Sequence, residues 1–270
     1  MNVVSSWFNI IVDFFVIMVP LEDTKEDKGI GRFLKECAEA FIIAMLITTF
    51  IRGFVVEIYK IPTGSMIPTL IGGLIAEKDV NNDGKDDLIV LSDNHYRNQG
   101  NPQYVFLKNH SWYEKIPRLA TEFLSVEPLK GKYEYDKILV NKFVYWFSKP
   151  KRGDIVVFKV PQSIYSSDKP FYIKRIVGLP GENLQIFDGS IYINGEEVQE
   201  PLRISEIYYE NDYQFSEDVV KTIPDNEYYL FGDNSGNSYD SRKWGGITIN
   251  QIKGKAFLRY WSFKKLNFVK

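Results

Sequence analysis

The sequence has 270 residues, a formal net charge of −2 and 44% hydrophobic residues. This length suits one ordinary domain with additions, or two small domains. The balanced charge argues against the basic surface of nucleic-acid-binding proteins, so no nucleic-acid partner is expected. One cysteine, Cys37, excludes an intramolecular disulfide. Because only two histidines are present, His95 and His110, neither a Ser-His-Asp triad nor a multi-histidine zinc site is expected.

Two apolar stretches occupy the N-terminal part of the chain. Residues 38–56 are about as long as a helix that crosses a hydrocarbon core of about 30 Å, and Glu39 and Arg52 near the ends can reach the interfaces. We therefore expect a transmembrane helix there, the alternative being a buried core helix. Residues 3–21 carry Asp13, which is costly in lipid, and are interpreted as a first span, an interfacial helix or an uncleaved anchor.

The charges between these stretches predict an orientation. A linker at about residues 22–36 is basic, with Lys25, Lys28, Arg32 and Lys35. Short basic loops remain on the cytoplasmic side, so the chain after residue 57 is expected outside. Residues 1–57 are thus interpreted as a membrane anchor with one or two helices and a cytoplasmic linker.

The rest of the chain is rich in strand-forming residues. Runs such as KILVNKFVYWF, DIVVFKV and KAFLRYW combine β-branched and aromatic residues between turn signals. Asp188-Gly189 and Asn194-Gly195 each predict a tight hairpin. After residue 125 no long amphipathic helix is evident, and a short helix is expected over residues 114–124. We predict a mainly β fold built from antiparallel strands.

A polar segment at residues 72–132 interrupts this pattern. Its beginning, EKDVNNDGKDDLIV, has Gly84 for a sharp turn, and Val90 stands where a calcium loop usually has its last acidic residue. The candidate calcium ligands present oxygens at alternating positions: Asp79, Asn81, Asp83 and Asp87. Two interpretations stay open, a calcium site and a solvated acidic turn without an ion.

Catalytic chemistry is suggested first by KIPTGSMIPTL, in which Pro62 and Pro68 restrict the backbone on both sides of Ser65. A rigid backbone favours catalysis because it presets the geometry of a nucleophile. The Ser65 amide and the Thr63 hydroxyl are candidate donors to an oxyanion. Taken alone, a serine in such a turn is more often structural.

A serine nucleophile needs a base, and lysine can replace histidine when burial lowers the pKa of its amine. Lys174 lies in the apolar run PFYIKRIVGLPGE, and strand alternation turns Arg175 to the opposite face. The alternative is an edge-strand lysine that points to water. A third segment, FGDNSGNSYDSRKWGG, is either an ordinary polar loop or a support that orients an amine through Ser238, Asp240 and Arg242.

These segments, in this order after an apolar helix, resemble the bacterial type I signal peptidases. The resemblance extends over nearly the whole chain and includes YDKILVNKFVYW and KRGDIVVFKVP. It implies a Ser/Lys serine endopeptidase, anchored in the bacterial plasma membrane with its active site on the exterior side, that removes signal peptides from exported preproteins. It also implies contact with the lipid bilayer and no required cofactor, and we expect a monomer.

The resemblance assigns roles to individual residues. It implies Ser65 as nucleophile and Lys174 as general base, with Thr63 at the oxyanion position. Ser238 would orient the lysine, and the loop would be braced by Asp240 and Arg242. The domains expected are a β catalytic domain at 58–71, 133–183 and 223–270, the polar insertion at 72–132, and a small β subdomain at 184–222.

The long insertion departs from the family pattern, and its role stays open between substrate gating, a partner surface and calcium-dependent stabilisation. Apolar residues near the anchor are expected to lie on the bilayer: Ile58, Ile61 and Ile67. Two other functions are considered: a self-cleaving Ser/Lys protease of related β fold, and a membrane-tethered calcium-binding module without catalysis. A precursor-cleavage assay with and without a chelator distinguishes catalysis from metal binding alone.

Overall fold

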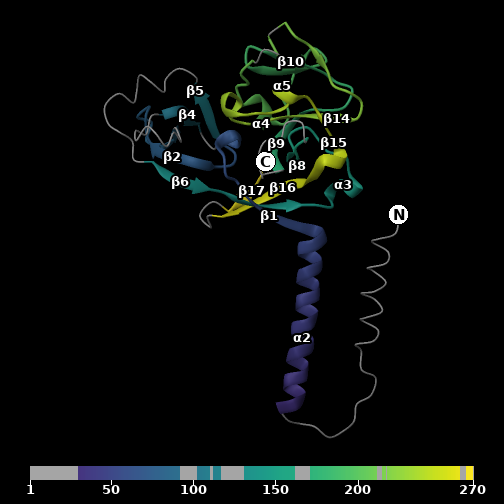
Figure 1. The fold of residues 1–270 in the computed structure, drawn as a ribbon. Helices are drawn as coiled ribbons and strands as arrows, with labels where there is room; N and C mark the ends of the chain where they lie inside the picture. Colours follow the sequence, from purple (N-terminus) through teal and green to yellow (C-terminus); the bar gives the residue numbers. More distant parts are fainter. Residues whose placement is uncertain are drawn as a thin grey trace. The chain divides into compact units, whose positions relative to one another are not determined.

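The computed structural model describes residues 30–91, 102–109, 112–116, 131–161, 171–211, 215–216, 218–261 and 266–269. It divides into two compact units, Met1–Thr49 and Phe50–Lys270. The described strands pair in antiparallel fashion and helices are few, so the mainly β prediction is confirmed (Figure 1).

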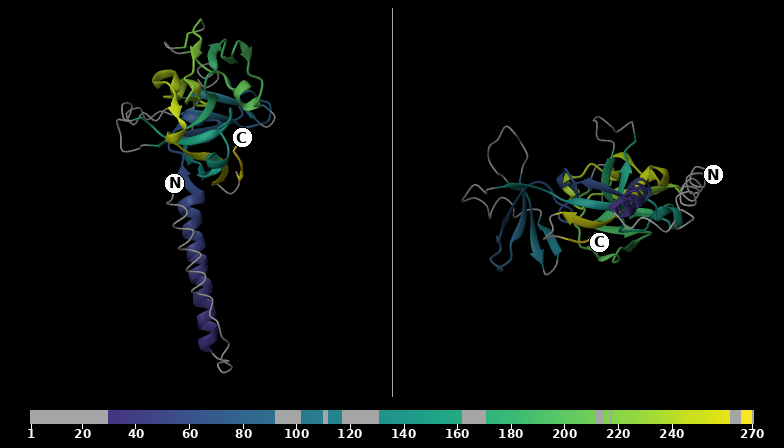
Figure 2. Two further views of the ribbon diagram at one scale, coloured as in Figure 1. Left: turned by 90° about the vertical axis from the view of Figure 1, so that its right-hand side faces the viewer. Right: turned by 90° about the horizontal axis from the view of Figure 1, so that it is seen from below.

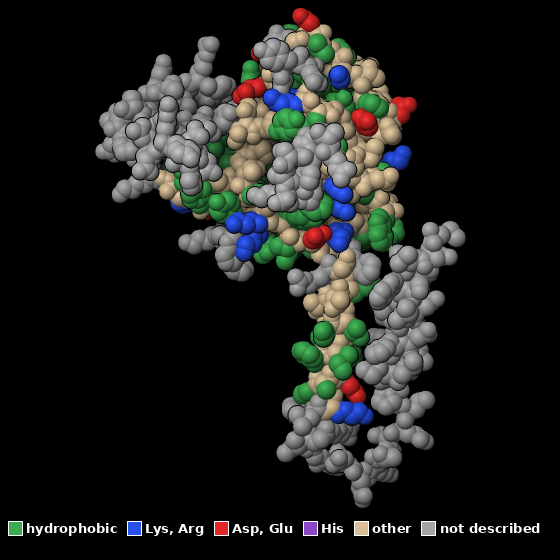
Figure 3. All heavy atoms as spheres, viewed as in Figure 1, with side chains coloured by type: hydrophobic (Ala, Val, Ile, Leu, Met, Phe, Trp, Pro, Cys, Tyr) green, Lys and Arg blue, Asp and Glu red, His purple; other side chains and the backbone are tan. Residues whose placement is uncertain are grey.

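The first unit is described by one helix, α2 (Ile30–Phe50), which a π-helical turn, η1 (Ile51–Val55), continues into the second unit. Its apolar side chains are exposed along the helix surface (Figure 3). The helix begins eight residues before the range predicted from the sequence, so that it also takes in the charged Lys35 and Glu36. Among the described residues, no helix combines the length and the apolar character needed to cross a membrane. The predicted stretch at 3–21 lies outside the described residues.

An eight-stranded sheet forms the centre of the second unit, in the order β1-β7-β16-β8-β9-β14-β15, with β17 paired to β16. Residues 155–158, IVVF, are buried on both faces of the sheet, because alternate side chains enter two different apolar clusters. An uninterrupted apolar run is typical of such a strand. The strands are β1 (Val56–Lys60), β7 (Lys137–Asn141), β8 (Ile155–Lys159), β9 (Phe171–Gly178), β14 (Glu227–Phe231), β15 (Ile247–Thr248), β16 (Ile252–Trp261) and β17 (Asn267–Phe268).

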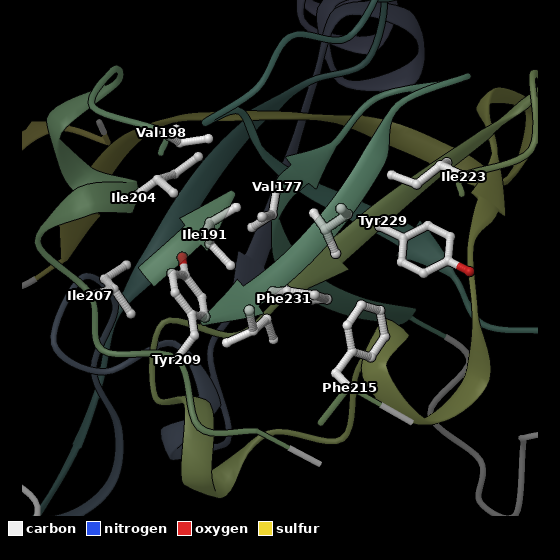
Figure 4. Close-up of a cluster of buried hydrophobic side chains, with 12 residues drawn as sticks. Val177, Ile191, Val198, Ile204, Ile207, Tyr209, Phe215, Ile223, Tyr229 and Phe231 are labelled. Carbon is white, nitrogen blue, oxygen red and sulfur yellow. The ribbon is translucent and has the colours of Figure 1, made fainter. Parts of the chain in front are cut away.

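A separate four-stranded sheet, in the order β12-β11-β10-β13, follows β9 in the chain. Its strands are β10 (Asn183–Phe187), β11 (Ser190–Ile193), β12 (Glu196–Glu197) and β13 (Lys221–Thr222). Both predicted hairpins are confirmed, with positive φ at Asp188, Gly189, Asn194 and Gly195. The apolar cluster of this sheet also includes Phe231 of β14 (Figure 4), so the small sheet shares a hydrophobic core with a strand of the central sheet.

The insertion folds as a five-stranded sheet, in the order β5-β4-β3-β2-β6 (Figures 1 and 2). Its strands are β2 (Gly72–Lys78), β3 (Asp87–Leu91), β4 (Pro102–Asn109), β5 (Trp112–Ile116) and β6 (Lys132–Tyr135). The polar description of this segment was therefore wrong for strands β2, β3 and β4, which bury two apolar clusters. The turn at 79–86 between β2 and β3 is rich in Asp and Asn. The short helix expected over residues 114–124 is wrong for residues 114–116, which belong to β5 and pair with β4, and residues 117–124 lie outside the described residues.

Short helical turns complete the described chain. They are η2 (Gly64–Met66), α3 (Val144–Phe147), α4 (Leu202–Ser205), η3 (Ser235–Asn237), α5 (Ser241–Trp244) and η4 (Ile249–Gln251). Two of them, η2 and η3, are in contact. This contact brings the serine segment next to the polar loop that follows β14.

Candidate active site

Ser65 lies on the 3₁₀ turn η2, within residues 61–71, which we call the serine turn. Within the serine turn, Thr63 precedes η2 in an extended conformation. The side chains of Met66 and Leu70 are buried in the core of the central sheet and hold the serine turn in place. Ser65 is 9% exposed. The hydroxyl is thus held at the edge of a packed core.

Lys174 lies on β9, opposite Val156 of β8. Its Nζ is 2.7 Å from Oγ of Ser65, and it also donates a hydrogen bond to the carbonyl oxygen of Ile173 at 3.0 Å. The side chain is 4% exposed. The structure therefore brings the two predicted residues together across 109 positions of sequence and removes the amine from solvent.

Burial lowers the pKa of the Lys174 amine from 10.5 to about 8, because the charged ammonium loses its hydration. The carboxylates of Asp240 and Asp233 act in the opposite direction, and the guanidinium of Arg242 lowers the pKa further. Near pH 8 a large fraction of the amine is therefore neutral. A neutral amine beside a hydroxyl is able to accept its proton.

A buried ion pair fixes the other face of the same strand. Arg175 donates to the carboxylate of Asp233 through Nε at 2.9 Å and Nη2 at 2.7 Å. The Thr69 hydroxyl of the serine turn donates to the same carboxylate and accepts from Nη2 of Arg175 at 3.3 Å. Bidentate pairs of this kind are strong and directional, so the ion pair links the serine turn to the lysine strand.

Asn234 forms a second link to the serine turn. Its backbone amide donates to the carbonyl oxygen of Ser65 at 3.0 Å, and its side-chain amide donates to the carbonyl oxygen of Gly64 at 3.0 Å. Thr69, Asp233 and Asn234 were not predicted from the sequence. Arg175 was the sequence feature that could have predicted Asp233, since an arginine inside an apolar strand requires a buried counter-charge.

Asp240 and Arg242 form a buried pair as the sequence suggested. Arg242 donates to the Asp240 carboxylate through Nε at 2.9 Å and Nη2 at 2.8 Å. Asp240 also accepts from the amide of Gly232 at 3.0 Å, and Arg242 donates to the carbonyl oxygens of Ser235 at 2.7 Å and Glu210 at 2.8 Å. These contacts close the loop that follows β14.

Ser238 and Thr63 have less defined contacts. Ser238 is buried, but its Oγ has no hydrogen-bond partner among the described residues, so the expected hydrogen bond to Lys174 is not formed in this structure. The amine instead donates to Ser65 and to the Ile173 carbonyl. Thr63 is exposed and lies two residues before Ser65.

The acidic loop uses its side chains to close a turn. Asp79 accepts from the amides of Asp83 at 3.2 Å and Gly84 at 2.8 Å, and Asn81 accepts from the amide of Asp83 at 3.0 Å. Asp87 is buried and accepts from the amide of Lys108 on β4 at 2.8 Å and from the amide of Val80 in the turn at 3.0 Å, so it joins the turn to the sheet. The part of the chain that the structure describes has no group of three His, Cys, Asp or Glu side chains placed to hold a metal ion.

The isoleucines expected on a bilayer differ in exposure. Ile58 is 54% exposed, whereas Ile61 is 2% exposed and Ile67 is fully buried. The prediction was therefore wrong for Ile61 and Ile67. Ile61 packs in the core of the central sheet, and Ile67 packs against the inserted sheet.

Comparisons with known proteins find related signal peptidases. Signal peptidase I of Leptolyngbya laminosa is 37% identical over 134 residues, covering 48% of this chain and 63% of that protein. Signal peptidase I of Bacillus caldolyticus is 35% identical over 138 residues, covering 48% of this chain and 72% of that protein. Signal peptidase I of Pseudomonas aeruginosa is 26% identical over 262 residues, covering 85% of this chain and 73% of that protein. The chain thus spans less than two thirds of the Leptolyngbya laminosa protein and more than two thirds of the other two.

A crystal structure of a signal peptidase I from Enterococcus faecalis V583 has 29% sequence identity and a TM-score of 0.32, covering 40% of this chain and 97% of that one. The family model described as "Signal peptidase, peptidase S26" matches residues 34–109 and 128–261, far more than half of the sequence. The chain belongs to the signal peptidase family, peptidase S26.

Proposed function

We propose that the chain is a serine endopeptidase that removes signal peptides from exported preproteins, with Ser65 as nucleophile and Lys174 as general base. The observation that supports this most strongly is the 2.7 Å separation between Ser65 Oγ and Lys174 Nζ. Membership of the signal peptidase family supports the substrate class. The lowered pKa of the amine supports its role as base.

The proposed reaction has two stages. The neutral Lys174 amine takes the Ser65 proton while Oγ bonds to the scissile carbonyl carbon, and the ammonium then gives that proton to the departing amine. The signal peptide is left as an ester on Ser65. In the second stage the amine takes a proton from water, the resulting hydroxide attacks the ester, and the proton returns to Ser65. Side chains alone supply this chemistry, so it needs no cofactor.

Other residues would position the substrate and the base. The Ser65 amide and the Thr63 hydroxyl are proposed donors to the oxyanion, and Thr63 is exposed beside the nucleophile. The buried pair of Asp240 and Arg242 is proposed to brace the loop that carries Ser238. A precursor would bind in extended form, with small side chains at the first and third positions before the cut.

We propose residues 58–71, 133–183 and 223–270 as the catalytic domain and 184–222 as a small β subdomain. Membrane attachment through the apolar helix, with the catalytic domain outside the bacterial plasma membrane, is supported by the exposure of Phe41, Met45 and Ile47, which are 70%, 62% and 52% exposed. Protease digestion of intact spheroplasts tests this topology, since degradation of the β domain from outside is expected. Protection of that domain would contradict it.

Calcium binding by Asp79, Asn81, Asp83 and Asp87 stays a prediction that concerns the insertion. It is separate from the dyad, because the four candidate ligands lie in the turn at 79–86 and at the start of β3, whereas Ser65 and Lys174 lie on η2 and β9. Calorimetric titration of the chain with calcium tests it. Heat of binding that disappears in an Asp79→Asn variant is the expected result, and no saturable heat would contradict it.

Cleavage of a labelled precursor by the full chain in detergent tests the proposed function. Wild-type protein is expected to release a signal peptide, whereas Ser65→Ala and Lys174→Ala are expected to lose cleavage by at least about 10³-fold. Circular dichroism checks that both variants are folded. Cleavage at the wild-type rate by either folded variant would contradict the dyad.

A further inference from the structure

The two faces of the inserted sheet form different apolar clusters. On β3, the side chains of Leu88 and Val90 point to one face and those of Ile89 and Leu91 to the other, and all four are buried. The first face forms one apolar cluster with two residues of the serine turn: its members are Ile67, Ile71, Ile75, Leu88, Val90 and Phe106. We call this the inner face. The opposite cluster, the outer face, contains no serine-turn residue among its described members.

The first residue of the insertion also lies against the serine turn. A Cβ at Gly72 would be 2.6 Å from the carbonyl oxygens of both Ile61 and Thr63, and 2.8 Å from the amide nitrogen of Thr63. Real side chains do not fit at such distances from backbone atoms. Strand β2 therefore begins in direct contact with the backbone that leads to Ser65, and only glycine permits this approach.

Asp136, which follows the last inserted strand, holds both flanks of the serine turn. Its carboxylate accepts from the amide of Ile71 at 2.7 Å. Its own amide donates to the carbonyl oxygen of Ile71 at 2.8 Å, and its carbonyl oxygen accepts from the amide of Ile61 at 2.9 Å. Arg259 donates to this carboxylate at 3.2 Å and to the carbonyl oxygen of Thr69 at 3.4 Å. The entry and exit of the insertion are thus tied to the same short segment.

From these contacts we propose that the inserted sheet supports the serine turn, and that packing of its inner face sets the reactivity of Ser65. Ile67 lies two residues after Ser65 and is fully buried in that face. A loss of packing there displaces the turn relative to Lys174, whose strand β9 is also held by pairing with β8 and β14. A displacement of about 1 Å at a reacting atom costs about 10²-fold in rate. The proposal rests on the proposed dyad for its kinetic consequence only.

The adjacent residues Leu88 and Ile89 allow a matched test, because both are buried aliphatic side chains of β3 on opposite faces. In the full chain in detergent, Leu88→Ala is expected to lower kcat for precursor cleavage about 10- to 100-fold with KM within about twofold. Ile89→Ala is expected to lose a similar amount of stability against urea as Leu88→Ala and to keep kcat within about threefold. Equal values of kcat in the two folded variants would overturn the proposal.

Hydrogen exchange provides a readout that does not depend on cleavage. The amides of Ile67 and Leu70 bond to Gly64 and Met66 within the turn, and Leu88→Ala is expected to speed their exchange at least about 10-fold relative to Ile89→Ala. Equal exchange in the two variants would overturn the proposal even if the wild-type chain cleaved no precursor. That absence of cleavage would instead contradict the proposed function. If Leu88→Ala does not fold, the milder pair Phe106→Leu on the inner face and Val105→Ala on the outer face replaces it, with the same expected contrast.

Discussion

Lys174 and Arg175 are neighbours on β9 whose side chains enter different buried environments. Nζ of Lys174 lies 2.7 Å from Ser65 Oγ, whereas the guanidinium of Arg175 forms a bidentate pair with Asp233 at 2.7 and 2.9 Å. Strand alternation alone separates the two cations. The amine can therefore lose its proton while the adjacent guanidinium stays charged and anchors the strand.

Replacing Thr69 with valine is expected to shift the pH dependence of cleavage. Its hydroxyl donates to Asp233, and the charge of Asp233 raises the pKa of Lys174. Without that hydrogen bond the negative charge of the Asp233 carboxylate is less neutralised, so it stabilises the Lys174 ammonium more strongly and the pKa of the amine increases. The acidic limb of kcat/KM is expected to move upward by about 0.3 to 1 pH unit, the equivalent of one hydrogen bond.

Thr69→Ser serves as the control because it keeps the hydroxyl. Its pH profile is expected to coincide with that of the wild type. The interpretation fails if Thr69→Val lowers the rate equally at every pH, since a purely structural defect does not move the limb.

Removing the partner of a buried charge is expected to destabilise the fold. Arg175→Met leaves the Asp233 carboxylate buried without its cation, which typically costs about 3 to 5 kcal/mol in unfolding free energy. Urea denaturation followed by tryptophan fluorescence measures this cost. Arg203→Met is the comparison, because the Arg203–Glu206 pair is partly exposed and is expected to contribute less than about 1 kcal/mol. Similar losses of unfolding free energy in the two variants would contradict the view that burial of the ion pair determines its contribution to stability.

The two hairpin glycines are expected to differ in their tolerance of alanine. Gly189 and Gly195 have φ of 76° and 87°, so both substitutions strain the backbone by about 1 kcal/mol. A Cβ at Gly189 would also lie 2.1 Å from the ring of Tyr208, whereas no atom lies within 4 Å at Gly195. Gly189→Ala is therefore expected to lower the melting temperature more than Gly195→Ala does, as measured by calorimetry. An equal decrease would contradict the close contact with Tyr208.

Several parts of the fold and site follow from local sequence. Asp188-Gly189 and Asn194-Gly195 specify their hairpins because these residues tolerate positive φ. Ser65 and Lys174 became candidates because each occupies an unusual local context, a restricted turn and an apolar strand, and the resemblance to the signal peptidases implied their roles. Such signals lie within a few residues of the side chain that they describe.

Other parts depend on contacts between distant segments. Thr69 and Asp233 meet across 164 positions of sequence, and nothing in either local pattern specifies the partner. The insertion was described as polar because its turn at 79–86 is dense in Asp and Asn, although Leu88, Val90 and Phe106 form a core with the serine turn. Ile67 was likewise expected on the bilayer because the residues of the inserted sheet that cover it come later in the sequence.

The pH dependence of precursor cleavage by the wild-type chain tests the central claim most directly, because the base must be neutral to accept the Ser65 proton. Burial lowers the pKa of Lys174 to about 8, so kcat/KM is expected to increase with pH, with a midpoint near 8 in the free enzyme. The rate should then be constant at higher pH. A profile that is flat across this region, or whose midpoint stays at the unperturbed lysine value of 10.5, would contradict a buried amine acting as the base.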